Sequence, residues 1–157
     1  MEAIKMPLEK GNSNNDPERI VLHAMTEWIF YEGEYLHAYH LLRKLGLSAH
    51  ALVTPSGQII RCRHDEQGAY HAKGHNTNTL GVEFLVPGLN SYDEFLEKIK
   101  HPSLTTEAFD EGTRLVRGWM SKWDIEKQDV VEHSQIDPTR KHDPGRGFPL
   151  STFLGSL

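Results

Sequence analysis

Two histidines and an aspartate stand at positions from which they could share a metal ion. His23 ends the apolar run 19–23, which suits a buried strand, and His133 ends the short apolar run 129–133. Asp143 lies on the loop that follows His133. Two neutral imidazoles and a carboxylate suit zinc and leave one coordination position for water, which the metal makes more acidic. These residues could therefore support metal-assisted hydrolysis.

The same residues have a simpler interpretation. The chain has ten scattered histidines, so two of them and a distant Asp combine by chance, and spacing alone favours separate hydrogen-bonding roles. Glu83 lies inside the apolar strand predicted over 79–88, where an ionised carboxylate is costly unless it has a partner. It is either a general base beside a metal-bound water or a solvent-facing residue on an edge strand. Lys141 is either a cation that stabilises an oxyanion or a solvated loop residue.

The elements around these residues predict one α/β domain. Apolar spacing indicates helices over 34–46 and 105–123 and a final helical turn over 150–157. Residues 48–63 read as a hairpin that turns at 54–57, where Pro and Gly occupy favourable turn positions. Strands and helices alternate, so we expect a central mixed β-sheet flanked by helices. Gly, Asn, Ser, Asp and Pro cluster before residue 18, which indicates a flexible arm over 1–18 and a catalytic domain over 19–157.

Composition narrows the class of protein further. A chain of 157 residues suits one domain with one sizeable core, and a net charge of −5 argues against a nucleic-acid partner. The single Cys62 cannot form an internal disulfide and suits a buried, unreactive thiol. The polar start lacks a signal-peptide core, and no apolar run is long enough to span a membrane. We therefore expect cytoplasmic synthesis and no membrane partner.

Three stretches, in the right order, resemble the zinc-dependent N-acetylmuramoyl-L-alanine amidases. This family includes phage lysozyme-type amidases, bacterial recycling amidases and peptidoglycan recognition proteins. The stretches are "SAHALVTPSGQI" (48–59), "HAKGHNTNTLGVE" (71–83) and "EHSQIDPTRKHDPG" (132–145). No single stretch is specific, but the resemblance runs from about Ile20 to Phe148, nearly the whole domain. It implies the single-domain fold of peptidoglycan recognition proteins and amidases.

The resemblance also implies roles for individual residues. One zinc ion would be held by His23, His133 and Asp143. Glu83 matches the general base and Lys141 the residue that stabilises the transition state. Members that lack this acid use a Tyr on the hairpin, and the corresponding position here is Ala49, which favours Glu83. The residues expected to bind substrate are His71, Asn78 and His50.

The activity implied is hydrolysis of the amide bond between N-acetylmuramic acid and L-alanine of peptidoglycan, by a monomer. Within the family, "HAKGHNTN" is most similar to phage endolysins, which are made in the cytoplasm and act on the cell wall after release. One alternative is a cytosolic recycling amidase that acts on soluble anhydro-muropeptides. Another is a peptidoglycan-binding module without activity, which the presence of all three matching ligands disfavours. Some members also inhibit an RNA polymerase, but nothing in the sequence indicates that function.

Overall fold

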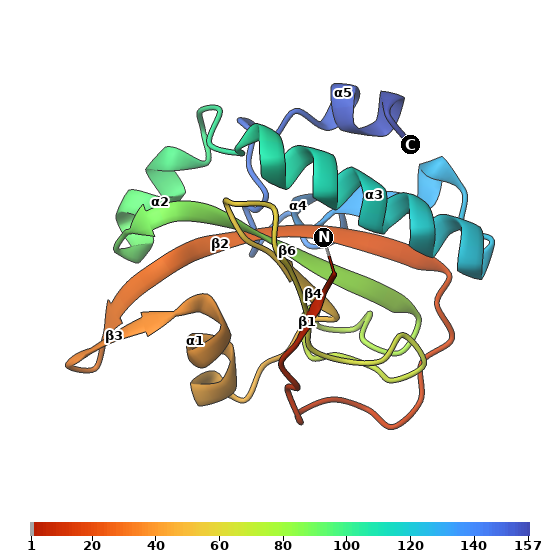
Figure 1. Cartoon of the computed structure of the whole chain (residues 1–157), viewed down its shortest axis with the longest axis horizontal. Helices are drawn as coiled ribbons and strands as arrows, with labels where there is room; N and C mark the ends of the chain where they lie inside the picture. Colours follow the sequence, from red (N-terminus) through yellow and green to blue (C-terminus); the bar gives the residue numbers. More distant parts are fainter. Residues whose placement is uncertain (1) are drawn as a thin grey trace.

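The computed structural model, which describes residues 2–157, contains one mixed seven-stranded sheet covered by helices on both faces (Figure 1). The sheet order is β1-β5-β4-β6-β2-β3, and β7 pairs with β2. The strands are β1 (Ile4–Lys5), β2 (Arg19–Tyr31), β3 (Glu34–His37), β4 (Ala51–Val53), β5 (Ile59–Arg61), β6 (Thr79–Leu89) and β7 (Val130–Glu132). The helices are α1 (Ala38–Leu45), α2 (Tyr92–Lys98), α3 (Thr106–Trp123), α4 (His133–Ile136) and α5 (Leu150–Gly155), with a short 3-10 turn at Lys127–Asp129. The expected mixed sheet flanked by helices is confirmed.

The long strands β2 and β6 form the centre of the sheet. They run parallel, and β6 is buried over residues 79–86, so this part of its sequence is largely apolar on both faces instead of alternating. β4 pairs with the other edge of β6, while β7 and β3 pair with the two halves of the outer edge of β2. The register sets His23 of β2 directly beside Glu83 of β6.

Helix α3 covers one face of the sheet, and α5 packs over α3 (Figure 1). The buried side chains of α3 follow helical spacing, as the sequence predicts. Thr105 caps the first turn of α3 by accepting a hydrogen bond from the Ala108 amide. Gly112 faces Phe84 of β6, and a Cβ atom at Gly112 would lie only 2.2 Å from the Phe84 ring. The glycine therefore sets how closely the helix approaches the sheet.

The other face of the sheet carries α1 and the N-terminal segment. Leu8 is only 3% exposed and packs with Tyr39 and Leu42 of α1. β1 pairs with β5, and the Arg63 guanidinium donates hydrogen bonds to backbone carbonyls of this segment. Residues 2–18, expected to form a flexible arm, thus pack along the domain, because they offer apolar and backbone groups that the sheet edge binds. The domain boundary expected at residue 19 therefore separates two segments that pack against each other.

Three further elements differ from the sequence-based expectation. The helix expected from residue 34 begins at Ala38, because β3 first pairs with the extended second half of β2. Helix α2 was not expected, although the sequence of 91–94 carries a capping box that the structure forms between Ser91 and Glu94. β7 ends at Glu132, so His133 opens α4 instead of ending a strand. Within residues 2–157, no helix combines the length and apolar character needed to cross a membrane.

Asp65 ties the loop after β5 to helix α3. Its side chain, 5% exposed, accepts hydrogen bonds from the indole N–H groups of Trp119 and Trp123 at 3.1 and 3.2 Å. It also forms ion pairs with Arg61 and Lys122. Burial disfavours the ionised carboxyl, but these cations and N–H donors outweigh burial and hold the pKa of Asp65 below its ordinary value.

We predict that Asp65→Asn lowers the free energy of unfolding by about 2 kcal/mol at neutral pH, because hydrogen bonds to a charged group are lost. The folded-state pKa of Asp65 is lowered, so its contribution is present above the unfolded pKa and is lost as pH falls through the folded pKa. Urea unfolding at pH 7 and at acid pH measures both effects. Asp110→Asn, on the exposed side of α3, is the control and should change little. An equal loss at both pH values would contradict the prediction.

A pair of glycines in α3 provides a second prediction. Alanine normally stabilises a helix relative to glycine by about 1 kcal/mol, and Gly118→Ala should do so because its Cβ would meet no neighbour within 4 Å. Gly112→Ala should instead destabilise the protein by about 1–3 kcal/mol, since the buried Phe84 ring leaves no space. Thermal unfolding of the two variants should shift in opposite directions, and a stabilised Gly112→Ala variant would contradict this packing.

Candidate metal centre and substrate cleft

Strand register places the first two site residues side by side. His23 and Glu83 are paired neighbours on β2 and β6, on the face of the sheet opposite α3, and are 1% and 8% exposed. His23 Nδ1 lies 3.9 Å from Glu83 Oε1. The other carboxylate oxygen of Glu83 is buried and has no hydrogen-bond partner among the described residues. Glu83 is therefore not a solvent-facing residue of an edge strand, one of its two sequence-based interpretations.

His133 and Asp143 reach the same point from the C-terminal part of the chain. β7 pairs with β2, so His133, the next residue, lies beside His23 with ring centroids 4.3 Å apart. The following loop turns back, and the Ser134 amide donates a hydrogen bond to the Asp143 carbonyl. Asp143 carboxylate oxygens lie 3.2 Å from His23 Nδ1 and 3.1 Å from His133 Nδ1.

One nitrogen from each histidine and one Asp143 oxygen lie within 4.8 Å of one another. Two imidazole nitrogens and a carboxylate oxygen at this spacing form a donor set that suits zinc with an open fourth position. The structure thus brings together the three residues that the sequence suggests as metal ligands.

Burial sets the protonation of this cluster. It lowers the pKa of His23, which favours the neutral imidazole that a metal requires. Burial also disfavours the charged form of Asp143, but the neighbouring imidazoles of His133 and His23 outweigh it and hold the pKa of Asp143 below its ordinary value. For Glu83, burial and the nearby Asp143 charge raise the pKa well above its ordinary value, and Lys141 opposes this. The two carboxyl groups differ strongly in proton affinity, so one suits ligation and the other proton transfer.

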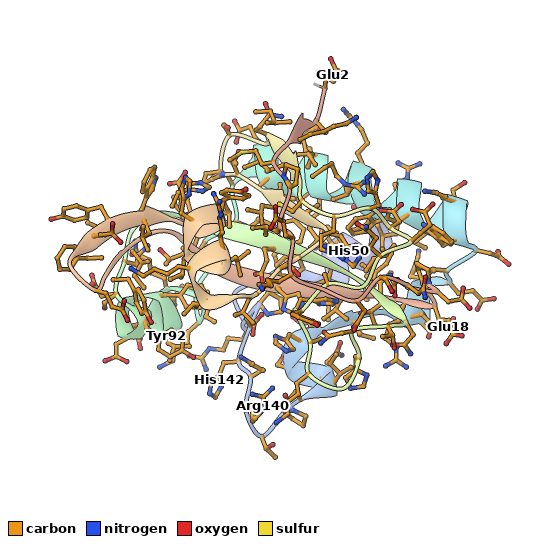
Figure 2. All side chains as sticks on the ribbon, turned by 90° about the horizontal axis from the view of Figure 1, so that it is seen from below. Glu2, Glu18, His50, Tyr92, Arg140 and His142 are labelled. Carbon is orange, nitrogen blue, oxygen red and sulfur yellow. The ribbon has the colours of Figure 1, made fainter. Side chains whose placement is uncertain are left out.

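The cluster lines a cleft of about 590 Å³. Leucines of α1 form one apolar wall, and Tyr92, Phe95 and Leu96 of α2 contribute another. Three cations, Lys73, Arg140 and Lys141, also line it. Tyr92, His142 and Arg140 follow one another along one side of the molecule (Figure 2). A cleft with apolar walls, cations and a buried metal-ligating cluster suits an anionic ligand with apolar parts.

The three residues expected to bind substrate occupy different environments. His71 lines the cleft and contacts His23, with His23 Nε2 at 2.8 Å from His71 Nδ1. His50 lies in the interior, fully buried (Figure 2). It bonds the Gln67 carbonyl and the Gly81 amide, and burial lowers its pKa to about 4. Asn78 is exposed, and its carbonyl accepts a hydrogen bond from the Glu18 amide.

His50 and Asn78 are not among the residues that line this cleft, so their contact with substrate stays a prediction. Residues that are neighbours in a motif can lie in the sheet, in the core or at the surface. Their proximity in sequence therefore does not show which of them face the cleft. Two further residues that line the cleft, Tyr92 and Phe95 of α2, are absent from the sequence-based predictions, and the capping box at 91–94 is the signal that could have revealed their helix.

A family model described as N-acetylmuramoyl-L-alanine amidase matches residues 13–146. The chain belongs to the N-acetylmuramoyl-L-alanine amidase family. The match covers all three stretches on which the resemblance was based, so that recognition and the expected enzyme class are confirmed. A search of curated proteins finds no match.

Solved structures of amidases share the fold. LysC, an N-acetylmuramoyl-L-alanine amidase from Clostridium intestinale URNW, is 18% identical, with 100% of this chain and 97% of LysC covered at a TM-score of 0.73. A selenomethionine derivative of AmpD is 17% identical, with 99% and 94% covered and a TM-score of 0.75. AmiD from E. coli, bound to its substrate anhydro-N-acetylmuramic acid-L-Ala-D-gamma-Glu-L-Lys, is 19% identical, with 92% and 58% covered and a TM-score of 0.70. At these identities the structures support the fold of the amidase family.

We predict that zinc stabilises the metal-stripped chain in a concentration-dependent way, because the ion binds a cluster that only the folded state assembles. At a free zinc concentration of about 100 times the dissociation constant, the gain should be about 2.7 kcal/mol. Asp143→Ala should remove most of this gain by deleting one ligand. Thermal unfolding with and without zinc is the measurement, and Asp110→Ala is the matched control. An unchanged zinc response in Asp143→Ala would exclude the proposed ligand set.

Proposed function

We propose that this chain is a zinc-dependent hydrolase that cleaves the amide bond between N-acetylmuramic acid and L-alanine in peptidoglycan. The observation that carries the proposal is the convergence of His23, His133 and Asp143 beside Glu83 in the lining of one cleft. Membership of the N-acetylmuramoyl-L-alanine amidase family supports this reaction over other metal-assisted hydrolyses.

The donor set fits zinc on structural grounds. Nδ1 atoms of His23 and His133 both face the Asp143 carboxylate, so their lone pairs and the carboxylate oxygens converge on one point when the imidazoles carry no proton there. A cation at that point would relieve the repulsion between these acceptors. Zinc held by these three side chains would supply a Lewis acid that polarises the scissile carbonyl and lowers the pKa of a water molecule.

Glu83 is the proposed general base. Its raised pKa and its unpaired buried oxygen suit a carboxylate that takes a proton from the attacking water and later gives it to the leaving amine. The water oxygen forms a bond to the lactyl carbonyl carbon of N-acetylmuramic acid, and the bond from this carbon to the L-alanine nitrogen then breaks. The proton taken by Glu83 converts that nitrogen to the free amine.

Lys141 is the proposed oxyanion partner. It lines the same cleft as Glu83 and Asp143, and it is close enough to Glu83 for its charge to act on that carboxyl group. As the carbonyl oxygen gains negative charge during attack, the ammonium group stabilises it. The cations Lys73 and Arg140 on the same cleft suit the carboxylates of a stem peptide, while the apolar walls suit its side chains and the sugar faces.

We predict that Glu83→Gln lowers the turnover number for peptidoglycan hydrolysis by about 10²- to 10⁴-fold, because an amide cannot accept the proton of water. Zinc affinity should stay within a few-fold of wild type, since Glu83 is not a proposed ligand. Release of stem peptide from purified sacculi measures the first quantity, and competition with a zinc indicator measures the second. Asp143→Ala should lose both. Full activity in Glu83→Gln would contradict the role of general base.

We further propose that the natural substrate is polymeric peptidoglycan, as for an endolysin. Support comes from the "HAKGHNTN" stretch and from the likeness to an endolysin amidase of Clostridium intestinale URNW, LysCS, of which 95% is covered. Stem-peptide release should be compared between intact sacculi and soluble anhydro-muropeptides, with and without a chelator. A higher kcat/KM on sacculi is expected, and preference for the soluble substrate would favour the recycling role instead.

A further inference from the structure

His23 is held from the side opposite the proposed metal. Its Nε2 atom lies 2.8 Å from His71 Nδ1, and His71 Nε2 lies 2.9 Å from the Thr79 hydroxyl. The Thr79 hydroxyl in turn lies 2.6 Å from the His75 carbonyl. These contacts form a continuous chain of hydrogen bonds from a backbone carbonyl to the proposed ligand.

The positions of the protons along this chain follow from the chemistry of each group. The His75 carbonyl can only accept, so the single hydroxyl proton of Thr79 points to it. Towards His71, the Thr79 oxygen can then only accept, and His71 Nε2 must carry a proton. A neutral imidazole with a proton on Nε2 has a bare Nδ1, which accepts from the ring opposite.

The same reasoning fixes the state of His23. Its Nε2 donates to the bare Nδ1 of His71, so a neutral His23 has no proton on its own Nδ1. This bare nitrogen is the atom that faces Asp143 and the Nδ1 of His133. His23 is 1% exposed, and burial in a group of neighbouring imidazoles disfavours a charged ring.

We propose that the Thr79–His71 pair is a positioning relay that fixes His23 in the tautomer required for metal binding. The inference rests on the proposed zinc site and reassigns His71, expected from the sequence to bind substrate, to a role that acts through His23. Thr79 sets the direction of the relay because its proton is committed to a backbone carbonyl that cannot donate. A hydrogen-bonded partner behind a ligand histidine both orients the ring and raises its basicity.

The fold around the relay is built to hold it. Gly81 leaves space for the His71 ring, since a Cβ atom there would lie 2.5 Å from His71 Nδ1. The Gly81 amide is in turn held by His50 Nδ1 at 3.0 Å. Asn76 accepts hydrogen bonds from the backbone amides of His71 and Ala72 through its side-chain oxygen. Both the ring and the backbone of His71 are therefore fixed.

His133 offers an internal contrast. Its Nε2 is buried without a hydrogen-bond partner among the described residues, and its Nδ1 lies 3.1 Å from Asp143 Oδ1. Among the described residues, the His133 ring makes hydrogen bonds only through Nδ1, to the Asp143 carboxylate, and these require a proton on Nδ1, the atom that would bind zinc. Zinc binding should therefore move the His133 proton but leave the tautomer of His23 unchanged.

Imidazole nitrogen NMR of the full-length, zinc-free chain labelled with ¹⁵N-histidine tests the relay directly. At about pH 8, above the ordinary histidine pKa, His23 and His71 should both show the tautomer protonated on Nε2, and His133 the one protonated on Nδ1. Added zinc should change the His133 signals from one tautomer pattern to the other and leave the His23 proton on Nε2. A His23 proton on Nδ1 in the zinc-free chain would overturn the proposal.

Variants test whether the relay affects metal binding. Thr79→Val removes the hydroxyl at nearly constant shape and should lower zinc affinity by about 10- to 100-fold, with a change in the His23 tautomer. Thr79→Ser keeps the hydroxyl and should restore both properties. Thr113→Val is the matched control, because Thr113 is also buried and donates to a backbone carbonyl, but lies on α3 away from the cleft. Wild-type zinc affinity in folded Thr79→Val would overturn the relay.

These measurements separate the relay from the proposed function. If zinc binds and hydrolysis proceeds while His23 carries its proton on Nδ1 in the metal-free chain, only the relay is overturned. If the tautomers are as proposed but zinc does not bind, the proposed metal site fails, and the role of the relay fails with it. The wild-type spectrum remains decisive even if Thr79→Val does not fold.

Discussion

The parallel pairing of β2 with β6 is the interaction on which the rest of the site depends. It sets His23 beside Glu83, and through the pairing of β7 with the other edge of β2 it brings His133 to the same point. A shift of one residue in either register would turn a side chain to the α3 face of the sheet, where the apolar core excludes it. The burial of both strands therefore fixes the geometry of the site, because each register is enforced by the apolar residues on both faces.

A buried site made of imidazoles and carboxylates is costly unless its polar groups have partners. The structure meets part of this cost on the side of His23 opposite the proposed metal, where His71 and Thr79 hold its ring. Among the described residues, one buried oxygen of Glu83 and the buried Nε2 of His133 have no hydrogen-bond partner. Such incomplete pairing is common where a ligand, metal or reacting group completes the arrangement.

The walls of the cleft are formed by helices and a loop outside the central strands. α1 and α2 supply apolar side chains, and the loop from Arg140 to Asp143 supplies cations together with a proposed ligand. This loop has two tasks, since it returns Asp143 to the histidines and also places Lys141 in the cleft. The flanking Pro138, Pro144 and Gly145 suit the sharp turns needed for that return.

Sequence alone was sufficient for the family, the mixed sheet and the identity of the residues that converge at the proposed metal site, because motif order and residue type carry that information. It did not determine which motif residues face the cleft. His50 and Asn78 lie within the same motifs as the site residues, yet the first is fully buried and the second is exposed. It also did not predict α2 or the packing of the N-terminal segment. Their apolar patterns are short, and they are stabilised only by packing against another part of the domain. Only the tertiary structure decided that His71 contacts both His23 and Thr79. These contacts depend on strand register and ring orientation, which segments distant in the sequence fix together.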